Sequence, residues 1–96
     1  MIKHVVMWKF KAESKEENLQ KAREMLLALV DIIPEIKKMN VYFDVSHTDM
    51  SADMMLDTEF LTLEDLNTYA VHPEHLKVSA FVRGVIESRV VLDSEI

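Results

Sequence analysis

The sequence contains no cysteine, one glycine and only two prolines among its 96 residues. Without cysteine the chain has no disulfide, no thiolate nucleophile and no cysteine-ligated metal. So little glycine and proline, together with a hydrophobic content of 49%, excludes disordered, collagen-like and low-complexity chains. Basic residues are also few, because 11 Lys and Arg stand against 17 Asp and Glu and leave a net charge of −6. Such an acidic balance repels phosphate backbones and anionic membranes, so we expect neither a nucleic-acid nor a membrane partner.

Long hydrophobic runs are absent as well. The longest run extends from Met25 to Val30, far short of the roughly 20 residues that a membrane-spanning helix needs. The segment from Met1 to Lys11 alternates apolar with charged residues and is therefore not the apolar core of a signal peptide. Together with the absence of cysteine, these features predict a soluble, cytoplasmic protein that folds as a single domain over residues 1–96.

Four segments alternate apolar and polar residues with a period of two, which predicts strands over 2–10, 39–45, 54–60 and 85–93. In the first segment we expect the bulkier face to meet the helices; it consists of Ile2, His4, Val6, Trp8 and Phe10. In the third segment one face carries Met54, Leu56, Thr58 and Phe60.

Two segments have the spacing of amphipathic helices. The first begins at Ser14, where the spacing to Glu17 predicts a capping box, and ends at Pro34. The second begins with a cap at Thr62. Pro73 should break or restart this helix, because proline suits the first turn and not the interior. Beyond the break we expect the apolar stripe to continue to Gly84 through Leu76, Ala80 and Phe81.

This order of elements predicts an α+β, ferredoxin-like βαββαβ fold with a four-stranded antiparallel sheet and the helices on one face. The other face is left bare although it carries Val5, Met7, Tyr42 and Met55. Such an apolar face is unusual on a monomer. We therefore expect a homodimer through the sheet face, which closes two sheets into a dimeric alpha-beta barrel with the helices outside.

Three stretches of the sequence resemble a known family. They are the opening Met1-Ile-Lys-His-Val-Val, the run Ile33-Pro34-Glu-Ile36 and the motif Tyr69-Ala-Val-His72-Pro73-Glu-His75. In these residues the chain is similar to the stress-responsive A/B barrel (Dabb) domains, which are dimeric alpha-beta barrels. The family includes plant stress proteins, uncharacterised bacterial members and a plant polyketide cyclase, so the resemblance implies the fold more firmly than an activity.

The resemblance implies a site at the Tyr69 motif. It matches His75 to the proton-transfer histidine of the plant cyclase and Tyr69 to its partner tyrosine, and His4 would lie in the same cleft if it faces the helices. A neutral imidazole can accept a proton near pH 7, and a phenol can stabilise a developing oxyanion. Around these three residues we expect ligand contacts from Val6, Trp8, Met54, Leu56, His72 and Phe81.

Alternatives stay open for both the site and the function. Tyr69 and His72 are instead anchors of the helix break if each is hydrogen-bonded to the backbone. The spacing His72-x-x-His75, with Glu74 beside the pair, invites a metal interpretation. No strong third ligand lies at a fixed spacing from the two histidines, so we expect no metal and no cofactor. Met54 stands where the plant cyclase has a pocket histidine, which makes the same substrate a poor expectation. Three functions follow: a small-molecule protein with cofactor-free His/Tyr cyclase- or lyase-like chemistry, a non-catalytic stress-response barrel and, more weakly, a cofactor-free monooxygenase.

Overall fold

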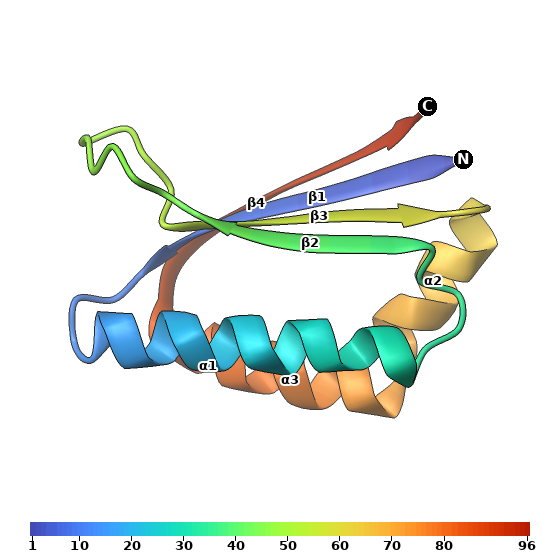
Figure 1. Cartoon of the computed structure of the whole chain (residues 1–96), viewed down its shortest axis with the longest axis horizontal. Helices are drawn as coiled ribbons and strands as arrows, with labels where there is room; N and C mark the ends of the chain where they lie inside the picture. Colours follow the sequence, from blue (N-terminus) through green and yellow to red (C-terminus); the bar gives the residue numbers. More distant parts are fainter.

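A four-stranded antiparallel sheet forms one layer of the protein, and three helices cover a single face of it (Figure 1). The computed structural model describes all 96 residues. Along the chain the elements are β1 (Ile2–Phe10), α1 (Lys15–Ala28), a 3-10 turn (Leu29–Asp31), β2 (Lys38–Phe43), β3 (Met54–Phe60), α2 (Leu63–Val71), α3 (Pro73–Val85) and β4 (Ile86–Glu95). The strand order β2-β3-β1-β4 confirms the predicted ferredoxin-like fold.

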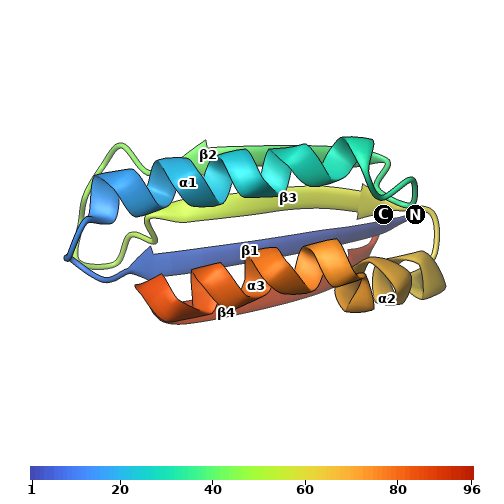
Figure 2. The ribbon, with the colours of Figure 1, turned by 90° about the horizontal axis from the view of Figure 1, so that it is seen from below.

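The core lies between the sheet and the helices. Seen from the helical side, α1 lies over β2 and β3, whereas α3 lies over β1 and β4 (Figure 2). The predicted inner face of β1 is confirmed, because Val6, Trp8 and Phe10 are buried there. None of the helices is both long enough and apolar enough to cross a membrane.

The two predicted helix starts differ in their chemistry. Thr62 caps α2 as expected, since its hydroxyl accepts a hydrogen bond from the backbone N–H of Asp65 at 3.1 Å. The capping box at Ser14 is wrong: Ser14 is left-handed, with φ of 52°, and its side chain makes no capping hydrogen bond. A capping hydroxyl reaches the first-turn amides from an extended backbone, which Ser14 does not have.

The break at Pro73 changes which residues of α3 face the core. Pro73 starts a new helix, which confirms the predicted restart. The apolar stripe expected beyond it is right for Phe81, which packs against the core, and wrong for Leu76 and Ala80, which are exposed while Val78 and Val82 are buried. Because α3 begins on a new axis, the residues that it turns toward the core are not those that a continuous helix would turn there. Gly84 does not end the helix, which continues to Val85.

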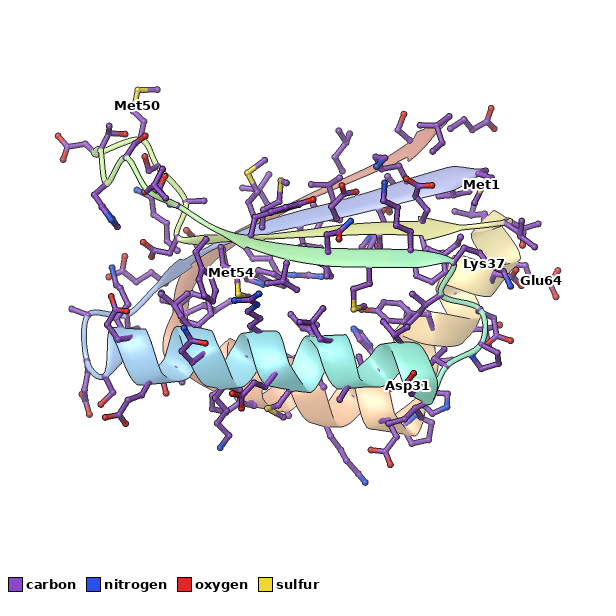
Figure 3. The ribbon with its side chains drawn as sticks, in the orientation of Figure 1. Met1, Asp31, Lys37, Met50, Met54 and Glu64 are labelled. Carbon is purple, nitrogen blue, oxygen red and sulfur yellow. The ribbon has the colours of Figure 1, made fainter.

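The connection between β2 and β3 protrudes beyond the sheet, with Met50 near its tip (Figure 3). β2 ends at Phe43 rather than at the predicted Val45, whose side chain is 86% exposed. The Asp44 carboxylate accepts hydrogen bonds from the backbone N–H groups of Ser46 and His47, and so turns the chain out of the sheet.

The outer face of the sheet is the side without helices (Figure 1), and it carries a mixed set of side chains. Its apolar members lie on all four strands and are Val5, Met7, Tyr42, Met55, Val90 and Leu92. At one end, Lys3 forms ion pairs with Asp57 at 2.8 Å and Glu59 at 3.1 Å. These hydrogen bonds raise the pKa of Lys3, so its ammonium stays charged.

Candidate active site

A cavity of about 80 Å³ lies between the inner face of the sheet and α3, and it is partly open to solvent. Its volume is several times that needed by one water molecule. Eight of its 13 lining residues are hydrophobic, namely Val6, Trp8, Leu26, Leu56, Tyr69, Val78, Val82 and Ile86. The other five are His4, His75, Ser79, Arg83 and Arg89. An apolar cavity with a few convergent polar groups is the usual form of a small-molecule site.

Tyr69 lies in the last turn of α2 and is 1% exposed. Its ring packs against Phe60, with centroids 5.1 Å apart. The phenol oxygen is buried and has no hydrogen-bond partner within the chain. Burial raises the pKa of Tyr69 far above its usual value of 10, so the hydroxyl stays protonated and can donate. A buried donor without a partner is costly, and a molecule in the cavity can satisfy it.

His75 lies in the first turn of α3, and its ring centroid is 4.3 Å from that of Tyr69. Its Nδ1 is 3.0 Å from the carbonyl oxygen of Ala70. Because a carbonyl only accepts, we assign the proton to Nδ1, which leaves Nε2 as the acceptor of the neutral ring. Burial lowers the pKa of His75 below its usual 6.5, although the bond to Ala70 opposes this shift. His75 is therefore neutral at pH 7 and has the form of a general base.

His4 reaches the same cavity from the inner face of β1. Its ring meets that of Tyr69 edge to face, with centroids 6.3 Å apart. Across the β1–β4 pair, His4 Nδ1 lies 2.5 Å from the Asp93 carboxylate. A carboxylate at Nδ1 orients the imidazole and holds the proton on that nitrogen. The structure thus brings Tyr69, His75 and His4 together, as the motif and strand parity predicted.

Three of the expected ligand contacts lie outside the cavity lining. Met54 is buried between the sheet and α1 (Figure 3). His72 instead caps α3, because its Nδ1 accepts a hydrogen bond from the backbone N–H of Glu74 at 3.1 Å. Phe81 faces α1, where Lys21 Nζ lies 4.5 Å from its ring centre. Phe81 lies outside the cavity lining because Val78 and Val82 occupy the side of α3 that faces the cavity. Val6, Trp8 and Leu56 do line the cavity.

The reasoning from sequence missed the arginines of the cavity. Arg89 is the register partner of Trp8, so its side chain leaves β4 on the inner face. The alternation of residues along β4 would have placed Arg89 on the inner face, but only if the pairing of β4 with β1 had been known. Arg83 comes from the last turn of α3. No group of three or more His, Cys, Asp or Glu side chains is arranged to hold a metal ion.

The fold and the cavity define a ferredoxin-like α+β protein with a mainly apolar cavity between sheet and helices. The chain belongs to the stress responsive A/B barrel (Dabb) domain family, whose sequence pattern matches residues 2–96. This confirms the predicted family.

Named relatives have different activities. The chain is 26% identical to olivetolic acid cyclase of Cannabis sativa over 96 residues, covering 96% of this chain and 93% of the cyclase. A dimeric protein of unknown function from Bacteroides fragilis has the same fold, with a TM-score of 0.91 and 28% identity over 99% of this chain and 95% of that one. The hydroxynitrile lyase of Passiflora edulis has a TM-score of 0.89 at 18% identity over 99% and 92%. The likeness therefore shows the fold, and proteins of this fold are named for more than one chemistry.

Replacing Tyr69 by Phe tests whether the phenol oxygen is free. The substitution keeps the ring packing and removes only a hydroxyl without a partner in the chain. We expect the free energy of unfolding, measured by chemical denaturation, to stay unchanged or rise by up to about 1 kcal/mol. Tyr69→Leu, the control, removes the ring contacts with Phe60 and His75 and should cost about 1–3 kcal/mol. A similar loss in Tyr69→Phe would mean that the hydroxyl is held by the protein.

Proposed function

We propose that this Dabb domain is a homodimer that holds a small apolar or aromatic molecule in the cavity and transfers a proton on it without a cofactor. One observation carries the proposal: a buried, unpartnered phenol lies beside a histidine whose free nitrogen is an acceptor. The phenol is a hydrogen-bond donor over the physiological pH range, and the imidazole is neutral at pH 7. Donor and base of this kind are the groups that enolisation of a carbonyl compound requires.

The two residues divide the work as follows. His75 Nε2 removes a proton from the carbon next to the substrate carbonyl, and the electron pair of that C–H bond forms the carbon–carbon double bond of an enolate. Tyr69 donates a hydrogen bond to the enolate oxygen, where the negative charge develops. The proton returns from His75 to carbon, or the enolate carbon attacks a second carbonyl and closes a ring. His4, oriented by Asp93, adds a second polar group to the same cavity.

The relatives support chemistry at this cavity without naming its substrate. A cyclase and a lyase are among the proteins that this chain is similar to. The specific alternative is a non-catalytic barrel, and it too has an observation in its favour. His72 and His75 each hydrogen-bond to the backbone at the junction of α2 and α3, so both histidines brace the fold.

Proton transfer is tested with acetophenone, an aromatic ketone, in D2O. We expect the wild-type protein to accelerate exchange of the methyl protons, followed by ¹H NMR, and His75→Gln to lose about 100-fold of this acceleration. Gln is polar and uncharged like the neutral ring but is not a base. Because burial lowers the pKa of His75, the wild-type rate should fall to half of its high-pH value at a pH below 6.5.

His47→Gln is the matched control, because His47 lies exposed in the β2–β3 connection. It should exchange acetophenone at the wild-type rate. If His75→Gln also keeps that rate, or if the wild-type protein does not exceed buffer, the non-catalytic alternative is correct.

The homodimer rests on the outer face of the sheet. Met7, Tyr42, Val90 and Leu92 are exposed there, and no element of the chain covers them. At the charged end of this face Lys3 is already paired within one protomer with Asp57 and Glu59, so burial of that end would not leave its ammonium unpaired. The Bacteroides fragilis protein of the same fold is described as dimeric. Sheet-to-sheet packing of two copies would bury the apolar residues of both.

The double variant Met7→Lys/Leu92→Lys tests this interface. Both side chains are exposed in the protomer, so its fold should persist, whereas four added charges would enter a symmetric interface. We expect light scattering to show a dimer for the wild type and a monomer with an unchanged circular dichroism spectrum for the variant. Leu76→Lys adds charge on the exposed side of α3, on the helical side of the sheet, and should leave the dimer intact. A wild-type monomer at micromolar concentration would contradict the interface.

A further inference from the structure

Two exposed arginines without an acidic partner, Arg83 and Arg89, line the cavity. All ion pairs of the structure involve lysine or histidine, and none includes Arg83 or Arg89. No carboxylate is among the residues that line the cavity. The protein as a whole has a net charge of −6, so this is a local concentration of positive charge in an acidic molecule. Arginine in such a place commonly marks the binding of an anion.

The position of Arg83 in its helix accounts for a positive charge there, whereas nothing within the chain accounts for the charge of Arg89. Arg83 lies in the last turn of α3, where a cation is stabilised by the helix dipole. Arg89 lies on an edge strand, opposite Trp8, and its side chain enters the cavity from the inner face. Two acidic residues share this face of β4: Asp93 is engaged by His4, and Glu95 lies six residues along the strand, opposite Ile2. Within the chain, Arg89 therefore has no structural partner for its charge.

We propose that the ligand carries a carboxylate and that Arg89 binds it at the mouth of the cavity. This specificity rests on the proposed function and deepens it. Tyr69 and His4 are buried at the inner end, whereas Arg83 and Arg89 are exposed at the outer end. A small molecule with an enolisable carbonyl at one end and a carboxylate at the other matches both ends. The planar guanidinium pairs with the two oxygens of a carboxylate through parallel hydrogen bonds.

The electrostatic environment of the inner residues agrees with this arrangement. Burial has the largest effect on both groups, raising the pKa of Tyr69 and lowering the pKa of His75. The positive charge of Arg89 acts on both as well, and in each case it works to lower the pKa. The field of the guanidinium thus reaches the groups at the inner end. A carboxylate bound to Arg89 would neutralise that field and strengthen the basicity of His75.

The test compares 4-acetylbenzoate with acetophenone, which has the same methyl ketone but no carboxylate. Dissociation constants are measured by chemical-shift titration of the cavity residues, so binding is read independently of exchange. We expect 4-acetylbenzoate to bind the wild type at least about tenfold more tightly than acetophenone. In Arg89→Gln this preference should fall by about tenfold or more. Lys77→Gln changes the charge equally on the solvent side of α3 and should keep the preference.

The possible outcomes separate the two proposals. Equal affinity for the two ketones, no binding of either, or an equal loss of both in Arg89→Gln would overturn the role of Arg89. Dissociation of the dimer in Arg89→Gln would also overturn it, because the arginine would then pair across the interface. If 4-acetylbenzoate binds through Arg89 but its methyl protons do not exchange, the carboxylate site stands and the proton-transfer function fails. If acetophenone exchanges its methyl protons but 4-acetylbenzoate binds no more tightly than acetophenone, the proton-transfer function stands and the carboxylate site fails.

Discussion

Proline at position 73 has no backbone N–H, and its ring cannot be accommodated inside a continuing helix. α2 therefore ends at Val71, and α3 begins at Pro73 with His72 as its cap. The candidate site depends on this junction. In a continuous helix, residues six apart point in different directions, whereas the new helix axis brings the rings of Tyr69 and His75 to 4.3 Å. The same junction directs Val78 and Val82, rather than Phe81, toward the cavity.

The junction also explains why one ring nitrogen of His75 is held by the backbone while the other is free. Its Nδ1 ties the start of α3 to the Ala70 carbonyl of α2, and this bond leaves Nε2 unprotonated in the neutral ring. Structural bracing and the proposed general-base chemistry would thus use opposite nitrogens of one side chain. Tyr69 has the complementary property, because its ring is fixed by Phe60 and His75 while its hydroxyl is free of the protein. The electrostatics of the pair favour a neutral base and a protonated donor at the same pH.

Much of the fold could be predicted from local patterns, whereas the site required tertiary information. Period-two alternation located β1 and β3 with their correct bounds, and Pro73 identified the helix restart. The phase of α3 could not be predicted, since it depends on the angle at which the new helix leaves the junction. Ser14 resembled a cap, but its left-handed backbone is decided by how the chain leaves β1. Arg89 was missed because its face follows from the register of β4 on β1, which no single segment contains.

The protonation state of His75 is the property on which a proton-transfer role depends most directly. Nitrogen-15 NMR of the imidazole, followed through a pH titration, reports both the tautomer and the pKa in one experiment. Above the pKa, the structure predicts the tautomer with the proton on Nδ1, in agreement with the bond to Ala70. It also predicts a pKa below 6.5, since burial disfavours the charged ring. A proton on Nε2, or a pKa at or above 6.5, would contradict a general base at this position.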